Sequence, residues 1–269
     1  MKKTLGIIGC GNIGTIIVRS YEKQLSDVVS KINLFDIDNI KMTALSKEAA
    51  CSVAAQDMEE LIMHSDIVVE AVSPRLVPEV LELCIKHSKD ILVMSVGGIL
   101  ECEELIELAR HKHINVILPS GAIAGIDAVK TAKISGIENV TITTRKPPKS
   151  LKGVAYLEQK GIDIDLIKKE TVIFEGTARE AIKIFPQNIN VSVILSLAGI
   201  GPDKTKVRII TSPEFTGNSH EIQVKAASGT ITTIADNVQS PDNPKTSYLA
   251  GLSAVAALKQ YCDPIKIGT

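Results

Sequence analysis

The chain has 269 residues, of which 45% are apolar and 3% aromatic, and its formal net charge at pH 7 is −1. A near-neutral chain argues against a nucleic-acid partner or an anionic membrane surface, because both require concentrated basic charge. No apolar run is long enough to span a bilayer, so we expect no membrane partner.

The five cysteines are scattered along the chain and form no CxxC pair. An odd number of dispersed cysteines indicates free thiols in a reducing compartment, and the cytoplasm is the expected location. No cluster of His, Cys, Asp and Glu residues indicates a catalytic metal, so we expect none.

The first half alternates short apolar runs with amphipathic segments, which predicts βαβ units and a parallel sheet covered on both faces. The expected strands are 4–9, 31–36, 51–55, 66–72, 91–96 and 114–118, and the expected helices are 12–25, 39–48, 57–63, 75–88 and 101–112. Six such strands are typical of a doubly wound dinucleotide-binding domain of the Rossmann type.

A glycine-rich stretch, residues 9–14, joins the first of these strands to the first helix. In the pattern G-x-G-x-x-G the glycines permit the turn, the approach of a pyrophosphate and close helix packing. Asp36 ends the second strand about 20 residues further on, where a carboxylate accepts ribose hydroxyls and repels the 2′-phosphate of NADP. The expected cofactor is NAD or NADP, with NAD favoured; a tight turn without a ligand is the alternative. The expected contacts are Gly9, Gly11, Asn12, Ile13, Gly14 and Asp36.

In such sheets the ligand lies beyond the carboxyl ends of the strands. Three further loops are expected there, namely 70–74, 95–98 and 119–125. Beyond residue 125 the pattern changes to alternating, β-branched segments at 139–144, 171–174, 206–210, 220–224 and 229–235, with helices at 127–135, 177–185 and 188–197. This predicts a mostly antiparallel sheet. The basic, proline-containing stretch 145–170 is interpreted as a surface excursion, and a final helix is expected over 247–261.

The predicted fold is α/β: an N-terminal Rossmann doubly wound parallel sheet, plus a second α/β domain with a mostly antiparallel sheet. The predicted boundaries are 1–119 for the dinucleotide-binding domain, 120–243 for a separate substrate domain, and 244–269 for a helix that returns to the Rossmann domain.

Several motifs now combine: Gly9–Gly14, Pro119–Ile123, Phe185–Val191, Leu197–Gly201, Gly217–Ile222 and Asn243–Ser247. In this order they closely resemble the L-aspartate dehydrogenase family over essentially the whole length. The resemblance implies an NAD(P)-dependent enzyme that oxidises L-aspartate to iminoaspartate, which yields oxaloacetate and ammonia and can feed NAD biosynthesis. It also implies a homodimer, a catalytic role for His220, and cofactor contacts at Ala122 and Asn190.

His220 also differs from the other four histidines on the residues alone, because it follows Gly217-Asn218-Ser219 and opens a strand of the second domain. A histidine can remove a proton from the substrate ammonium and activate water for imine hydrolysis. The alternative interpretation of His220 is a hydrogen-bonded residue at a strand end. The alternative for Asn190 is a residue at the start of a helix that satisfies local backbone groups, and Asn188 is the expected cap of that helix. Lys225, Lys245, Thr246 and Ser247 are candidates for binding the substrate carboxylates, without a preference among them.

Two alternative functions remain open. A homoserine dehydrogenase or dihydrodipicolinate reductase shares this two-domain plan, but the catalytic lysines of the former and the basic cluster of the latter are not recognisable. A non-catalytic protein that senses NAD(H) requires the glycine turn but no catalytic histidine. His220 therefore distinguishes these classes.

Overall fold

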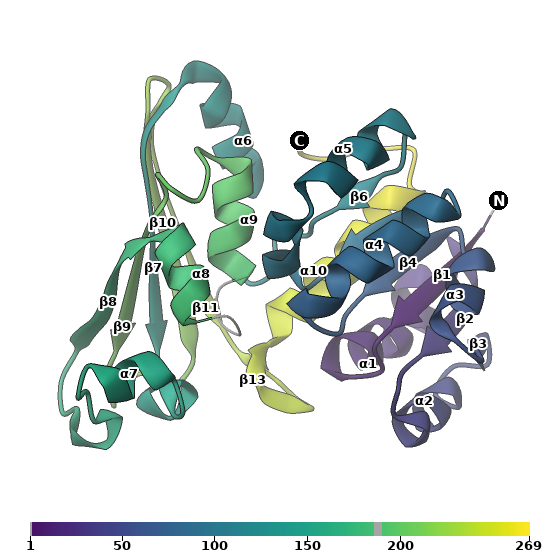
Figure 1. Cartoon of the computed structure of the whole chain (residues 1–269), viewed down its shortest axis with the longest axis horizontal. Helices are drawn as coiled ribbons and strands as arrows, with labels where there is room; N and C mark the ends of the chain where they lie inside the picture. Colours follow the sequence, from purple (N-terminus) through teal and green to yellow (C-terminus); the bar gives the residue numbers. More distant parts are fainter. Residues whose placement is uncertain (1, 186–189) are drawn as a thin grey trace. The chain divides into compact units, whose positions relative to one another are not determined.

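The structure is a computed structural model, and it describes residues 2–185 and 190–269. The chain divides into two compact units, Met1–Gly121 with Ala250–Ile267 and Ala122–Leu249 with Gly268–Thr269. Each unit is built around one sheet (Figure 1). Within the described ranges, no helix has both the length and the apolar character needed to cross a membrane.

The first unit contains a six-stranded parallel sheet in the order β3-β2-β1-β4-β5-β6. Its strands are β1 (Lys3–Ile8), β2 (Val29–Phe35), β3 (Ser52–Ala54), β4 (Ile67–Glu70), β5 (Asp90–Val93) and β6 (Val116–Ile117). This order is that of the Rossmann fold, so the predicted fold class of the first half is confirmed. The central strands are continuous buried runs, because helices cover both faces of such a sheet.

The helices of this unit are α1 (Asn12–Arg19), α2 (Asn39–Ser46), α3 (Met58–Met63), α4 (Val77–Lys86), α5 (Glu103–His111) and α10 (Tyr248–Cys262), with a π-helical turn at Tyr21–Leu25 and 3₁₀ turns at Pro74–Leu76 and Val96–Glu101. The C-terminal helix α10 packs on α1, where an added Cβ at Gly251 would lie 2.4 Å from Cδ1 of Ile16. Tyr261 of α10 donates a 2.7 Å hydrogen bond to Asp90 of β5. Helix α10 is thereby fixed to the sheet of the first unit.

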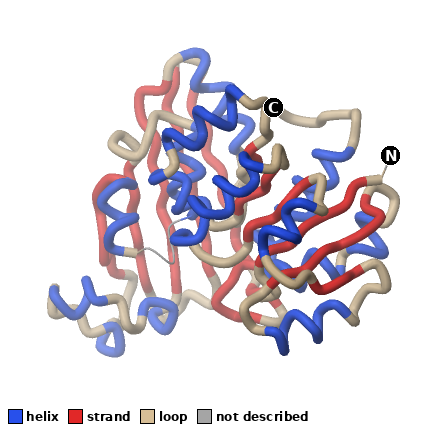
Figure 2. Tube along the Cα trace, turned by 45° about the vertical axis from the view of Figure 1, so that its right-hand side comes forward, coloured by secondary structure: helices blue, strands red, loops and turns tan. Residues whose placement is uncertain are grey.

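The second unit contains a five-stranded sheet in the order β11-β10-β7-β9-β8. Its strands are β7 (Ile137–Lys146), β8 (Thr171–Thr177), β9 (Lys206–Thr211), β10 (Asn218–Ala226) and β11 (Gly229–Asn237), and they lie side by side as long red segments in Figure 2. Only β7 and β9 pair in parallel. The prediction of a mostly antiparallel sheet is therefore confirmed.

Helices α6 (Ile126–Ser135), α8 (Ala178–Ile184) and α9 (Asn190–Ala198) lie on one face of this sheet (Figure 1). Along β10, residues 220, 222, 224 and 226 are buried while 221, 223 and 225 are more exposed. The same alternation places Val140 and Ile142 of β7 on the buried face. An added Cβ at Gly199, just after α9, would lie 3.6 Å from Val140. The helices therefore cover the face that carries the even-numbered residues of β7 and β10.

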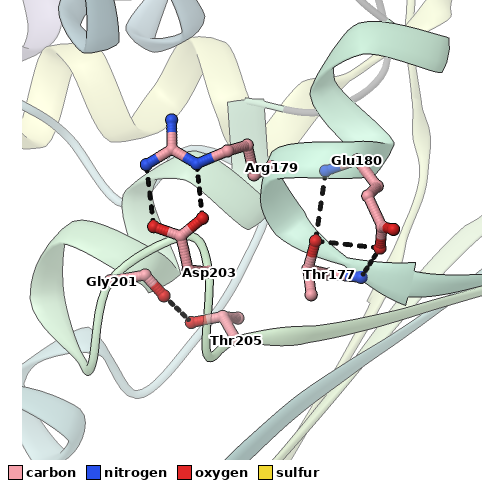
Figure 3. Close-up of polar contacts among 6 residues, drawn as sticks. All are labelled: Thr177, Arg179, Glu180, Gly201, Asp203 and Thr205. Atoms are coloured by element: carbon pink, nitrogen blue, oxygen red, sulfur yellow. Dashed lines mark hydrogen bonds and ion pairs between the residues drawn. The ribbon is translucent and has the colours of Figure 1, made fainter.

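The start of α8 and the loop after α9 are tied together by side chains (Figure 3). Thr177 and Glu180 form a capping box, which satisfies free N–H groups at the start of α8. Arg179 makes a bidentate ion pair with Asp203, and Thr205 donates to the carbonyl of Gly201. These contacts fix both ends of the segment that contains α9.

Two boundaries differ from the sequence-based expectation. Residues 145–146 continue β7 instead of opening a surface excursion, and the excursion that follows contains 3₁₀ turns at Pro148–Leu151 and Ile164–Leu166 and the short helix α7 (Ala155–Gln159). Asn243–Ser247 forms β13, which pairs with β12 (Gln239–Ser240). The segment that joins the first unit therefore begins at Ala250 and not at 244.

The glycines of the turn 9–14 have different surroundings. Gly9 has φ +105°, and an added Cβ there would lie 2.5 Å from the carbonyl oxygen of Ala71. An added Cβ at Gly14 would lie 2.2 Å from the carbonyl oxygen of Gly9, whereas one at Gly11 would meet nothing within 4 Å. Gly9 and Gly14 are thus required by packing, and the space over Gly11 is open.

Gly14→Ala should therefore lower the free energy of unfolding by about 1–3 kcal/mol, because the new methyl group collides with backbone. Gly11→Ala should change it by less than about 0.5 kcal/mol, because its methyl group enters open space. Urea denaturation of both variants beside the wild type measures the difference. Equal losses in the two variants would contradict this account of the turn.

Candidate active site

The glycine turn and Asp36 form one hydrogen-bonded unit. Asp36 accepts a 2.7 Å hydrogen bond from the backbone N–H of Cys10 and a 2.8 Å hydrogen bond from that of Asp38. The carboxylate therefore holds the end of β2 against the turn. The sequence alone predicted only that Asp36 binds the ribose of the cofactor.

The N-terminus of α1 is suited to an anion. No side chain caps it and its first turn has no acidic residue, so the positive end of the helix dipole is not offset there, which favours a phosphate. Gly11 is exposed and leaves open space above the backbone, while Asn12 and Ile13 are half-buried. These residues fit a dinucleotide, whose pyrophosphate needs both the open space and the N–H groups.

Glu70, at the end of β4, is a buried carboxylate whose role sequence reasoning missed. It is 0% exposed, and it accepts hydrogen bonds from the backbone N–H groups of Val72, at 2.8 Å, and Ser95, at 3.0 Å. Burial raises the pKa of Glu70 above its ordinary value. The side chain joins the loops after β4 and β5, two of the three loops singled out at the carboxyl edge of the sheet.

The predicted contacts Ala122 and Asn190 lie in the second unit. The carbonyl of Ala122 accepts a 3.0 Å hydrogen bond from the side-chain amide of Asn237 at the end of β11. Asn190 is the first residue of α9 and is half-buried. Asn188, the proposed cap of this helix, lies outside the described residues.

His220 lies on the helix-covered face of the second sheet. It is 4% exposed, and its Nδ1 lies 3.0 Å from the hydroxyl oxygen of Thr144, the residue directly opposite on β7. Because a hydroxyl can accept from Nδ1–H, this contact can leave the lone pair on Nε2 for proton transfer. Burial, and then the charge of Lys146, lower the pKa of His220 to about 3, so the ring is uncharged at neutral pH.

Lys146, the last residue of β7, lies on the same face as Thr144 and His220, because it is two residues beyond Thr144 along the strand. It is 6% exposed, and burial lowers its pKa to about 8. Sequence reasoning missed this lysine, because it fell in the stretch set aside as surface. The alternation of β7 extends to this residue, but the sequence does not show that the strand continues to Lys146, because two basic residues followed by prolines also fit a surface stretch.

The other candidate cations and histidines lie elsewhere. Lys225 lies on the opposite face of the sheet, where it makes a 2.7 Å ion pair with Glu138. Thr246 and Ser247 lie in β13, and the side chain of Lys245 is outside the described residues. The remaining four histidines belong to the first unit; His87, for example, contacts Glu59. Across the described ranges, no group of three or more His, Cys, Asp or Glu side chains is placed to hold a metal ion.

Family models match both parts of the chain. Residues 127–261 match the model "Aspartate dehydrogenase, C-terminal", and residues 9–119 match "Homoserine dehydrogenase, NAD binding domain". Together they cover the glycine turn, Asp36 and the region of His220.

Relatives and solved structures give the same result. The L-aspartate dehydrogenases of Methanosarcina mazei and Methanosarcina barkeri are 42% and 41% identical over 98% of this chain and 99% of theirs. The crystal structure of aspartate dehydrogenase from Thermotoga maritima is 30% identical, with a TM-score of 0.78 and full coverage of both chains. A homoserine dehydrogenase from Thiobacillus denitrificans is 13% identical with a TM-score of 0.64, and it shares the fold. The agreement of identity, coverage and structure shows that this chain belongs to the L-aspartate dehydrogenase family.

Proposed function

We propose that this protein oxidises L-aspartate with NAD or NADP to iminoaspartate, which water converts to oxaloacetate and ammonia. The observation that carries the proposal is the identity of about 40% to L-aspartate dehydrogenases over nearly the whole chain. The first unit supplies a dinucleotide site at the glycine turn, and a bound nicotinamide cofactor would accept the hydride. The second unit serves as the substrate and catalytic domain.

In this proposal His220 handles the protons. Its ring is uncharged at neutral pH and can therefore accept a proton from the substrate ammonium. A bound dicarboxylate places negative charge near the ring and stabilises the imidazolium that forms. The same group can then activate water for imine hydrolysis. Thr144 orients the ring through the 3.0 Å contact to Nδ1. Gly9, Gly11, Asn12, Ile13, Gly14, Asp36, Ala122 and Asn190 are assigned to the cofactor.

Wild-type protein should reduce NAD or NADP when L-aspartate is added, and His220→Ala should lower kcat by about 10²–10⁴-fold, the usual contribution of an acid–base group. The absorbance of the reduced cofactor measures the activity of the wild type and of the variant. Cofactor affinity should stay nearly unchanged, because the glycine turn belongs to the other unit.

His111→Ala is the matched control, because the side chain of His111 is 75% exposed and belongs to the first unit. A folded His220→Ala enzyme with near-normal kcat would remove His220 from catalysis. L-homoserine should be added in parallel, because the family model of the first unit is shared with homoserine dehydrogenases. Turnover of homoserine in place of aspartate would overturn the proposed function.

We also propose that Asp36 favours NAD over NADP, since its charge repels a 2′-phosphate. Asp36→Asn should narrow the NAD preference, measured as the ratio of kcat/KM values, by about tenfold or more, which is about 1.4 kcal/mol. Gly11→Val is the control. The valine side chain would enter the open space over the turn, so it should weaken the binding of NAD and of NADP to the same extent. A strong preference of the wild type for NADP would refute the assignment of Asp36.

A homodimer through the second sheet is a further part of the proposal. Helices α6, α8 and α9 cover one face of this sheet (Figure 1). On the other face, Ile234 pairs with Glu221 across β11 and β10 and is 59% exposed. We assign the contact to this face because no helix of the second unit that the structure describes covers it, and a two-fold contact uses the same surface of both copies. The cysteines are free, which supports the cytoplasm as the location.

Light scattering should give twice the chain mass for the wild type, and Ile234→Lys should shift the protein toward the monomer, because it places a charge in the proposed contact. Ile134→Lys is the matched control, since Ile134 is 89% exposed on α6, away from the sheet face. A wild-type monomer, or an unchanged mass of Ile234→Lys, would contradict the dimer surface.

A further inference from the structure

Glu70 is a carboxylate that the fold buries completely. Among the Asp and Glu residues that the structure describes, it is the only buried one, and it is 0% exposed. Burying such a group is costly, and burial raises the pKa of Glu70. The rest of β4 is the apolar run Ile67-Val68-Val69, so packing alone would be served by another apolar residue. The carboxylate therefore requires a reason other than packing.

The hydrogen bonds of Glu70 provide that reason. One carboxylate oxygen accepts from the backbone N–H of Val72 at 2.8 Å, and the other accepts from the backbone N–H of Ser95 at 3.0 Å. Val72 lies in the loop after β4, and Ser95 lies in the loop after β5. Each oxygen thus holds one loop, and the rigid carboxylate sets the spacing between them.

The two loops also pack against each other. An added Cβ at Gly98 would lie 2.2 Å from the carbonyl oxygen of Pro74, so the backbones approach closely there. Because the side chain of Glu70 is fully buried, it does not reach a ligand at the edge of the sheet. Glu70 can act on a ligand only through the loops that it holds.

The order of the strands relates these loops to one half of a dinucleotide. The order reverses between β1 and β4, and in such sheets each half binds one mononucleotide beside the reversal. The glycine turn and Asp36 belong to the half formed by β1, β2 and β3, which takes the adenosine part. The loops that Glu70 holds belong to the other half, which takes the nicotinamide part.

The glycine turn is held independently of the Glu70 side chain. The carbonyl oxygen of Ala71 confines Gly9, and the N–H of Ala71 donates its own 2.9 Å hydrogen bond to the carbonyl of Ile8. Asp36 holds the turn from β2 through the N–H of Cys10. A change in the side chain of Glu70 should therefore leave the adenosine and pyrophosphate contacts in place.

We propose that Glu70 is the positioning residue of the nicotinamide subsite, where it holds loops 71–74 and 95–98 at the spacing that the nicotinamide and its ribose require. This inference rests on the proposed function and assigns the second half of its cofactor site. A carboxylate suits the task, because it offers an acceptor to each of two N–H groups that no strand or helix satisfies. Losing one acceptor leaves a buried N–H unpaired, which releases that loop.

The test compares Glu70→Gln with Asp90→Asn. Glutamine keeps the size of the side chain but turns one acceptor into an NH₂ donor, so that one loop loses its partner. Asp90 provides the matched change at the opposite edge of the sheet, since it begins β5 and accepts hydrogen bonds from Asn115 and Tyr261.

Glu70→Gln should weaken binding of the reduced cofactor by about tenfold, and it should change binding of the ADP-ribose portion of that cofactor by less than about twofold. Asp90→Asn should keep the wild-type ratio of the two affinities. Fluorescence titration with the reduced cofactor, followed by displacement with its ADP-ribose portion, measures both. An equal loss for the two ligands, or no loss for either, would overturn the proposal.

If Glu70→Gln does not fold, Glu70→Asp takes its place. Aspartate keeps the charge, but it is one methylene shorter and cannot reach both N–H groups. It should show the same selective loss, and an unchanged ratio of affinities would overturn the proposal. A selective loss in a protein whose wild type binds the cofactor but does not oxidise aspartate would refute the proposed function alone.

Discussion

The pairing of β7 with β10 is the constraint on which the candidate active site depends. It sets Thr144 opposite His220, and through the alternation of the strand it brings Lys146 to the same buried face. Shifting this register by one residue would turn all three side chains to the other face of the sheet. Hydrophobic burial of Val140, Ile142, Ile222 and Val224 opposes such a shift, since these residues share the face that the helices cover.

Burial then determines the chemistry of the two ionisable groups. Removing water from His220 and Lys146 disfavours the charged form of each, and the lysine charge lowers the pKa of the histidine further. The result is an uncharged ring beside a group that is mostly cationic at pH 7.

The first unit uses carboxylates for a different purpose. Asp36 holds the glycine turn against the end of β2, and Glu70 joins the loops after β4 and β5. Both lie at strand ends, where backbone N–H groups need acceptors. Different glycines of the turn serve packing and binding. Gly9 and Gly14 are confined by neighbouring backbone, while Gly11 faces open space.

The sequence alone was sufficient for the architecture. Alternating strand and helix patterns predicted a Rossmann domain followed by a mostly antiparallel sheet, and the sheet orders confirm both. Helix and strand periodicities are local properties, so they can be read without tertiary contacts. The glycine turn and the family resemblance could also be recognised from the sequence. The structure also places His220 on a strand, although β10 begins two residues earlier, at Asn218.

Lys146 could not be recognised in the same way. In the sequence, Arg145 and Lys146 are two adjacent basic residues before a pair of prolines, and both fit a solvated surface. In the structure, Arg145 pairs with Glu221 on the open face of the sheet, while Lys146 is buried on the covered face. Which of two neighbouring side chains loses its water depends on strand register and on the helices that pack above it. Those are long-range contacts, and only the tertiary structure decides them.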